Sequence, residues 1–208
     1  MLKHIPETYE IIGKIGSGKS GDVYKAYHKN LRTYVVLKKV KTELRNLVNN
    51  RAEVDVLKNL RHSGLPQVYD FLEVDGDVYT VMTFVEGNSF GQYLDSGREF
   101  EEKSVIIWAR QICATLCYMH EQKPPIVHGD LKPENIMLRP DGNICLIDFN
   151  ISASLDGGDA WVTGYTNGYA APEQIEAMRY NQNELDSSHW KKADPRSDLY
   201  LSLIHISE

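Results

Sequence analysis

The first part of the chain alternates between apolar and polar positions, a pattern typical of β-strands with one buried face. Together with β-branched and aromatic residues bounded by turn residues, it predicts five strands. These cover residues 9–15, 23–28, 33–40, 67–72 and 78–84. The pair Asp75-Gly76 predicts a tight turn that joins the last two strands as a hairpin.

Helical periodicity interrupts the strands once and then dominates the rest of the chain. It predicts one helix at about 43–60, a short helix at 89–95 and a long helix at 102–120. The long helix is expected to turn one apolar face inward, made of Val105, Ile106, Ala109, Ile112, Leu116 and Met119. The pattern thus predicts an α+β chain, with a β-rich lobe at 1–84 and a helical lobe at 85–208.

One segment concentrates the chemically active side chains. Within 19 residues it holds two carboxylates, an amide and a lysine: Asp130, Lys132, Asn135 and Asp148. Asp141-Gly142 predicts the tip of a hairpin, which would bring Asp130, Asn135 and Asp148 together at its other end. Carboxylate and amide oxygens suit a magnesium ion that carries phosphates. The segment therefore indicates a phosphoryl-transfer site.

A glycine-rich stretch near the N-terminus fits two different phosphate-binding motifs. Residues 16–23, GSGKSGDV, fit the kinase pattern G-x-G-x-x-G-x-V, whose glycines let the backbone approach phosphates closely. Residues 13–20, GKIGSGKS, also satisfy the Walker A pattern of P-loop NTPases, and 144–148 could pass for a Walker B strand. A P-loop must open a helix, whereas residues 22–28 alternate as a strand does. The pattern therefore favours the kinase arrangement of strand, turn and strand.

Lys38 lies on an otherwise apolar strand, Val35-Val36-Leu37-Lys38. A lysine there is costly unless its charge is used, although a snorkelling side chain is the simpler alternative. Its expected partner is Glu53, on the predicted helix. Glu43 competes, but it lies at the expected helix start, where an acidic residue serves as a cap.

Taken in order, these motifs resemble those of the eukaryotic-like Ser/Thr protein kinases, in the form common in bacteria. The resemblance covers residues 9 to about 200 and continues through Ala171-Pro172-Glu173 and Ser197-Asp198-Leu199-Tyr200. It implies a two-lobed kinase-like fold with one helix in the β-rich lobe and an incomplete helical lobe. It also implies transfer of the γ-phosphate of ATP to Ser or Thr hydroxyls of protein substrates, with Mg²⁺.

The resemblance also implies a role for each catalytic residue. Asp130 would accept or orient the proton of the substrate hydroxyl, Lys132 would steady the γ-phosphate, and Thr166 would bond to both. Asn135 and Asp148 would hold magnesium. Lys38, held by Glu53, would orient the α- and β-phosphates.

For ATP itself, the resemblance implies a pocket built largely from the β-rich lobe. Val23 and Val36 would sandwich the adenine, Met82 would gate the rear, and Thr83 and Val85 would offer backbone groups to the base. The implied ATP-binding residues are Ile15, Gly16, Gly18, Gly21, Val23, Val36, Lys38, Met82, Thr83 and Val85.

Three positions depart from the family pattern. Gly129 stands where many members have the arginine that pairs with a phosphorylated activation loop, so we predict a kinase that loop phosphorylation does not switch on. Asn150 replaces a glycine, and asparagine keeps access to left-handed backbone conformations. Val36 replaces the usual alanine and adds bulk over the adenine.

The chain also departs from the family after Tyr200, where members continue into a long buried helix and several more. We expect a C-terminally truncated chain. Glu173 would then lack the arginine that pairs with it, at a cost of roughly 3–5 kcal/mol. The helix at 102–120 would expose apolar residues that later helices normally cover.

Composition restricts the partners and the compartment. A net charge of −6 and a pI of about 5.7 argue against a nucleic-acid binder. No apolar run is long enough to span a bilayer, although a membrane tether in a longer form would not be visible. Three cysteines form neither a disulfide framework nor a metal site, so we expect a reducing cytoplasm and a buried Cys113 and Cys117.

Two other functions stay open. Aminoglycoside and choline kinases also carry His-Gly-Asp with a downstream asparagine, so a small-molecule phosphotransferase is one alternative. Ala171-Pro172-Glu173 and Lys132-Pro133-Glu134 point away from it, because both serve peptide binding in protein kinases. An inactive ATP-binding pseudokinase is the other, supported by the expected truncation alone. The pattern leaves the oligomeric state undetermined.

Overall fold

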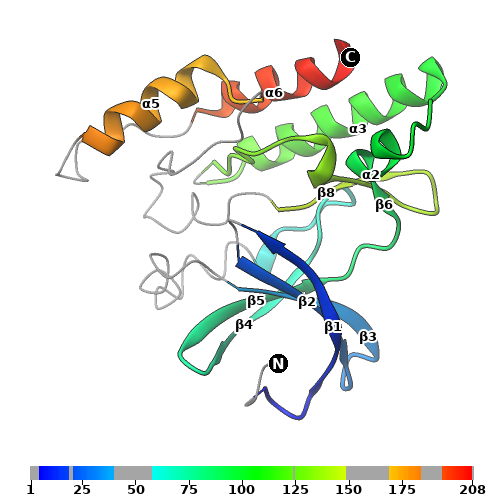
Figure 1. Cartoon of the computed structure of the whole chain (residues 1–208), viewed down its shortest axis with the longest axis vertical. Helices are drawn as coiled ribbons and strands as arrows, with labels where there is room; N and C mark the ends of the chain where they lie inside the picture. The colour runs from blue at the N-terminus through cyan, green and yellow to red at the C-terminus, as the bar shows by residue number, and fades with distance from the viewer. Residues whose placement is uncertain are drawn as a thin grey trace. The chain divides into compact units, whose positions relative to one another are not determined.

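The computed structural model describes residues 5–18, 21–39, 58–123, 125–148, 169–183 and 194–207. It has the mixed α+β architecture of a β-rich unit and a partial helical unit (Figure 1). The first unit comprises Met1–Arg61 with Pro66–Phe84, and the second comprises His62–Leu65 with Val85–Glu208. The short segment 62–65 thus belongs with the second unit, although strand residues of the first unit follow it.

A five-stranded antiparallel sheet forms the first unit (Figure 1). Its order is β1-β2-β3-β5-β4, so each neighbouring pair is a hairpin except β3-β5. The strands are β1 (Tyr9–Gly18), β2 (Gly21–His28), β3 (Thr33–Lys39), β4 (Val68–Val74) and β5 (Asp77–Thr83). All five predicted strands are present, within a few residues of their expected bounds.

The β4–β5 hairpin forms because its turn residues accept an unusual backbone. Asp75 and Gly76 have φ angles of 54° and 76°, the left-handed pair that a tight hairpin turn requires. Asparagine, aspartate and glycine enter this region at the lowest cost. The predicted turn at Asp75-Gly76 is confirmed.

The two faces of this sheet differ in burial, as the two-residue period of a strand requires. One face forms the core of the unit, where Ala26, Val35, Leu37 and Val81 are fully buried. The residues between them point to the opposite face. That face carries Val23, Val36, Lys38 and Met82, because Val23 pairs with Lys38 and Val36 with Met82 across the strands.

The second unit combines helices with a small sheet. Its described elements are β6 (Asn88–Ser89), α2 (Phe90–Asp95), α3 (Glu102–His120), the 3-10 turn η2 (Pro133–Asn135), β7 (Ile136–Leu138), β8 (Ile144–Leu146), α5 (Pro172–Asn183) and α6 (Pro195–Ser207). Ser89 caps α2 in a capping box with Gln92. The helix α3 packs against both α6 and β8. In this described part of the chain, no helix has the length and apolar character needed to cross a bilayer.

The buried face of α3 is narrower than predicted. Ile112, Leu116 and Met119 are buried as expected, but Ile106 is 46% exposed. At 100° per residue, Ile106 lies about 120° around the helix from Ile112, too far to share its packed face. Cys113 and Cys117 lie on the same flank and are exposed, so the prediction that they are buried was wrong. Only Cys145, on β8, is buried.

Candidate phosphotransfer site

The β7–β8 hairpin brings the two ends of the catalytic segment together. Its strands pair in register from Ile136 and Leu146, and Gly142 in the turn has a φ of 79°. At the other end, the Ile147 N–H donates to the Asn135 carbonyl oxygen at 2.9 Å. Asp148 therefore follows directly after a residue bonded to Asn135. The expected hairpin at Asp141-Gly142 is present.

Asn135 connects the loop to Asp130. It is 5% exposed, and its Nδ2 donates to the Asp130 carbonyl oxygen at 2.7 Å and to Asp130 Oδ2 at 3.2 Å. Lys132 Nζ forms an ion pair with the same Oδ2 at 2.8 Å. Both charged side chains keep access to solvent, so a carboxylate stays available to a substrate at the end of a rigid loop.

The oxygen atoms at this end of the hairpin fit a magnesium ion. Because the amide nitrogen of Asn135 is directed at Asp130, the amide oxygen is the atom that would face a cation. Asp148 adds a carboxylate, and its φ of 63° is a left-handed conformation that costs a non-glycine residue of the order of 1 kcal/mol. No cluster of three His, Cys, Asp or Glu occurs among the described residues. Magnesium needs none, since it commonly uses one or two protein carboxylates together with phosphate oxygens.

A single buried carboxylate holds the backbone of the catalytic loop. Asp198, on α6, is fully buried. Its Oδ2 accepts the His128 N–H and its Oδ1 accepts the Gly129 N–H, both at 2.8 Å. His120 Nε2, at the end of α3, lies 2.8 Å from Oδ2 as well. Charge-assisted bonds to one carboxylate thus tie α3, α6 and the catalytic loop together.

His128 completes this support from beneath the loop. Its buried ring places Nε2 3.2 Å from the Ile147 carbonyl oxygen, and its Nδ1 accepts the Asp130 N–H at 3.4 Å. A nitrogen facing a carbonyl must donate and one facing an N–H must accept. The neutral tautomer with the proton on Nε2 satisfies both contacts.

The carbonyl side of Gly129 is held by a residue from α5. Gln174 is 3% exposed; its Nε2 donates to the Gly129 carbonyl oxygen at 2.9 Å, and its Oε1 accepts the Ala171 N–H at 3.0 Å. Gly129 has a φ of 73°, which glycine adopts without strain. The peptide groups on both sides of Gly129, the residue before Asp130, are therefore fixed.

The sequence carried no role for Gln174 or Asp198. Asp198 stood inside a family motif, and Gln174 simply followed Ala171-Pro172-Glu173. The bonds of both residues to the catalytic loop span 45 to 70 positions. Periodicity and turn signals are local, so they do not reveal such contacts.

Glu173 accepts a hydrogen bond from a neutral donor in the described part of the chain. The Ser197 hydroxyl, at the start of α6, donates to Glu173 Oε1 at 2.9 Å. The first turn of α6 supplies a neutral donor where the family pattern supplies an arginine. The expectation that Glu173 lacks the arginine of the family pattern stays a prediction.

The glycine loop of the first unit joins two strands. Gly18 pairs with Gly21 at the end of β1 and β2, and β2 continues to His28. The P-loop interpretation, which requires a helix here, is wrong. Gly21 has a φ of 107°, and a Cβ on it would lie 2.9 Å from the Lys39 carbonyl oxygen. A glycine is required at this position by both criteria.

Side-chain contacts also connect β1 and β2 near the glycine loop. Lys14 Nζ lies 2.7 Å from Asp22 Oδ1, and the Ser17 hydroxyl donates to the same carboxylate at 3.0 Å. The bonds from Lys14 and then Ser17 lower the pKa of Asp22. The sequence predicted no role for Asp22. In the structure its carboxylate connects β2 to Lys14 and Ser17 of β1, next to the glycine loop.

The implied ATP-binding residues other than Gly18 and Gly21 lie in four places. Val23, Val36, Lys38 and Met82 share one face of the sheet, and Gly16 pairs with Val23. Ile15 lies at a register shift in β1 and is 51% exposed. The Thr83 N–H already donates to the Gln67 carbonyl oxygen at 2.9 Å, so only its carbonyl could serve a base. Val85 begins the second unit, half-buried.

Some predictions fall outside the described residues. Glu53 and most of the helix predicted at 43–60 lie there, as do Thr166, Asn150 and most of the segment between Asp148 and Glu173. The pairing of Lys38 with Glu53 and the role of Thr166 therefore stay predictions.

Two features define a phosphotransferase of the kinase type. One is a sheet whose first two strands are joined by a glycine turn, and the other is a loop that carries Asp130, Lys132 and Asn135 directly before the β7–β8 hairpin. Residues 9–190 match the family model described as protein kinase domain. The chain belongs to the protein kinase family.

Curated relatives cover most of this chain. It is 29% identical to serine/threonine-protein kinase cds1 of Schizosaccharomyces pombe, over 93% of this chain and 43% of the relative. It is 32% identical to the maternal embryonic leucine zipper kinase of Danio rerio, over 89% of this chain and 27% of the relative. It is 32% identical to serine/threonine-protein kinase 36 of Mus musculus, over 84% of this chain and 13% of the relative. The chain spans less than half the length of each of these relatives.

Proposed function

We propose that the chain transfers the γ-phosphate of ATP to Ser or Thr hydroxyls of protein substrates. The observation that carries the proposal is the arrangement of Asp130, Lys132 and Asn135, joined by contacts of 2.7–3.2 Å on a loop held from both sides. Membership of the protein kinase family and the printed names of the relatives support the same activity.

In this proposal Asp130 acts on the attacking hydroxyl. Its carboxylate is solvent-accessible and fixed by the amide of Asn135, so it is positioned to orient the hydroxyl and accept its proton. Lys132, 2.8 Å from that carboxylate, lies close enough to contact a phosphoryl group delivered there. Phosphoryl transfer relies on positioning and charge stabilisation, and a rigid loop supplies both.

Asn135 and Asp148 are the residues that would hold magnesium. Bound there, magnesium would neutralise charge on the phosphate oxygens. The protein's contribution is to present an amide oxygen and a carboxylate at one end of the β7–β8 hairpin. Lys38, with Glu53 as its proposed partner, would bind the α- and β-phosphates.

Gln174 and Glu173 favour a protein over a small-molecule substrate. Both follow the Ala171-Pro172 turn, and they connect it to Gly129 and to Ser197. A segment tied to the catalytic loop in this way is suited to present a peptide beside Asp130. The alternative small-molecule phosphotransferase rests on the His128-Gly129-Asp130 sequence with its downstream asparagine, Asn135. The resemblance to the bacterial form of the family stays a prediction.

The activity is tested with radiolabelled ATP, magnesium and a generic basic protein. We expect transfer to Ser or Thr, reduced about a thousandfold or more in Asp130→Asn, because the variant lacks the proton acceptor. Asp141→Asn, at the exposed hairpin turn, is the matched control and should keep full activity. Transfer to small hydroxylated or aminated compounds only would replace the proposal with the small-molecule alternative. ATP binding without transfer, measured as a thermal shift, would leave the pseudokinase alternative.

Gly129 also determines the proposed mode of regulation. Without an arginine before Asp130, a phosphorylated loop has no receiver at this position, and the clamp by Asp198 and Gln174 already fixes the loop. We expect phosphatase treatment to leave the activity of the chain unchanged and Thr163→Ala to keep that activity, whereas Thr166→Ala should lower it by removing the proposed bonds to Asp130 and Lys132. Loss of activity in Thr163→Ala together with its recovery in Thr163→Asp would contradict this.

A further inference from the structure

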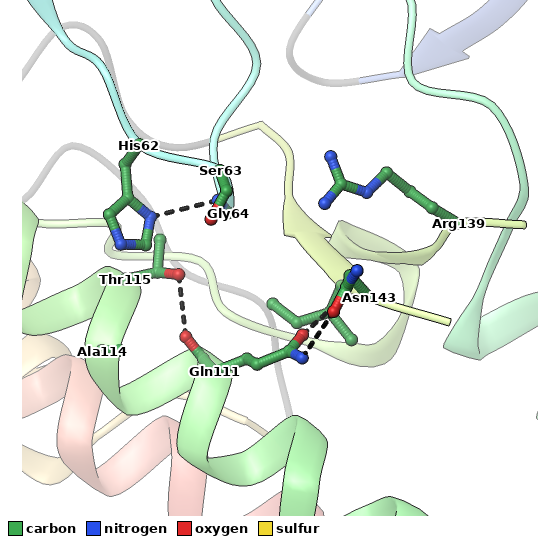
Figure 2. A pocket seen from close by; sticks show the side chains of 9 residues that line it. His62, Ser63, Gly64, Gln111, Ala114, Thr115, Arg139 and Asn143 are labelled. Atoms are coloured by element: carbon green, nitrogen blue, oxygen red, sulfur yellow. Dashed lines mark hydrogen bonds between the residues drawn. The ribbon is translucent and has the colours of Figure 1, made fainter. Parts of the chain in front are cut away.

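A cavity of about 240 Å³ lies within the second unit, away from the catalytic residues (Figure 2). Its described walls are the 62–64 segment, one side of α3 and the turn between β7 and β8. Asn135 and Asp148 flank the other end of that hairpin. The length of the strands therefore separates the cavity from the proposed phosphotransfer chemistry.

Three side-chain acceptors that line this cavity, on Gln111, Asn143 and His62, already take part in local hydrogen bonds (Figure 2). Gln111 Nε2 donates to Asn143 Oδ1 at 2.9 Å, and Gln111 Oε1 accepts the Ile144 N–H at 2.9 Å. His62 Nδ1 accepts the Gly64 N–H at 3.1 Å. Its ring stacks on Tyr118, which fixes its orientation. A ligand that needed an acceptor from Gln111, Asn143 or His62 would have to break one of these bonds.

Arg139 supplies the opposite kind of group. It is the one lysine or arginine among the described lining residues, and no aspartate or glutamate lines the cavity with it. Figure 2 shows its side chain reaching from the hairpin turn in the direction of Ser63. Its Nε is buried and has no hydrogen-bond acceptor within the described parts of the chain. Its Nε forms an ion pair with Asp141 Oδ1 at 3.6 Å, which is too long for a hydrogen bond and involves a carboxylate that is exposed to solvent.

A buried charged N–H without an acceptor is costly, and an unfilled acceptor position commonly marks where a water or an anion belongs. We infer that this cavity is a binding site for a carboxylate, which Arg139 holds from the β7–β8 turn. One guanidinium matches the single charge and the planar oxygens of a carboxylate. The volume admits a small acid or the terminal residue of a peptide, and both sources present the same chemistry.

The site is tested on the full chain by titration followed in amide NMR spectra. The probes are succinate, a short acetylated peptide ending in glutamate, the doubly amidated form of that peptide, and inorganic phosphate, each up to about 20 mM. We expect succinate or the acidic peptide to shift the amides of His62, Gly64 and Asn143. Binding of the peptide alone identifies a chain end as the source, and binding of succinate as well identifies a free acid.

Arg139→Gln should weaken this binding about tenfold, because it removes the charge-assisted bond. Arg110→Gln changes the net charge equally at an exposed position of α3 and should leave affinity within about twofold. If Arg139→Gln does not fold, Arg139→Lys keeps the charge without the paired N–H groups and should still weaken binding. The comparison of the binding of the acidic peptide with that of its amidated form needs no variant of the protein.

Four results would overturn the inference: no shift of these amides by either acid, equal binding of the peptide and its amide, equal effects of the two glutamine variants, or phosphate binding as tightly as succinate. None of these measurements depends on catalysis, so the site stands or falls separately from the proposed activity.

Discussion

Gly129 is held on both sides of its peptide backbone by residues distant in sequence. The N–H is bound by Asp198 of α6, and the carbonyl by Gln174 of α5. A glycine can take the observed φ of 73° without cost, whereas an alanine there would be strained by about 1 kcal/mol. The position of Asp130 therefore depends on two buried polar side chains that belong to neither the loop nor the nucleotide site.

Gln174→Leu should lower both stability and turnover. Two backbone groups, the part-buried Gly129 carbonyl and the buried Ala171 N–H, would lose their partner, at a cost of about 1–3 kcal/mol. We expect urea unfolding to show this loss, and kcat to fall more than KM changes, because Asp130 loses its fixed position. Gln182→Leu, on the exposed side of α5, is the control. Equal kinetics in the two variants would show that Gln174 does not position the loop.

The three cysteines should differ in reactivity. Burial raises the pKa of the Cys145 thiol to about 12, so it forms almost no thiolate below pH 9, whereas Cys113 and Cys117 are exposed. Iodoacetamide at pH 8 should label Cys113 and Cys117 in the native protein, and Cys145 only after denaturation. Peptide mass spectrometry reads out each site. Native labelling of Cys145 would contradict its placement in β8.

The segment 62–65 belongs with α3 because a glycine allows close approach. A Cβ on Gly64 would lie 2.1 Å from Thr115 Oγ1, and that hydroxyl donates to the Gln111 carbonyl oxygen at 2.8 Å. The Gly64 carbonyl oxygen in turn accepts the Leu146 N–H at 2.8 Å. The glycine thus links β8 and α3 through a segment with no regular structure.

Gly64→Ala should destabilise the protein by about 1–3 kcal/mol, because Thr115 cannot move away without losing its hydrogen bond. Gly13→Ala, where nothing lies within 4 Å of an added Cβ, is the control for the loss of glycine. In a double-mutant cycle, Thr115→Ala should recover part of the loss, since it removes the clashing oxygen. Purely additive effects in denaturant unfolding would reject this steric explanation.

The elements were predictable where the signal is local. Both hairpins formed where Asp-Gly pairs interrupt β-rich runs, and Ile112, Leu116 and Met119 of α3 are buried as their spacing indicated. Ile106, Cys113 and Cys117 were misplaced, because apolar composition does not give the width of a buried face. The sequence did not predict the contacts of Gln174 and Asp198 or the bond from Ser197 to Glu173. Each of these contacts joins segments that are far apart in the chain.

The whole chain is acidic, and its charge is spread over two compact units. With a net charge of −6 it cannot release many counterions from a nucleic-acid backbone. We expect no retention on heparin and no binding to single-stranded DNA at about 150 mM salt, followed by fluorescence anisotropy. A strongly basic protein of similar size is the positive control. Binding that weakens steeply with added salt would contradict the prediction.

The β7–β8 hairpin sets the distance between the catalytic residues at one of its ends and the cavity at the other. Each strand has three residues, so about 10 Å separates the rung beside Asn135 from the turn that carries Arg139. Deleting one opposed pair of residues would shorten the hairpin by about 3.3 Å and turn every later side chain to the other face, because side chains alternate along a strand. The spacing between the catalytic end and the cavity can therefore change without reversing the faces only in steps of two opposed pairs, removed from or added to both strands at once.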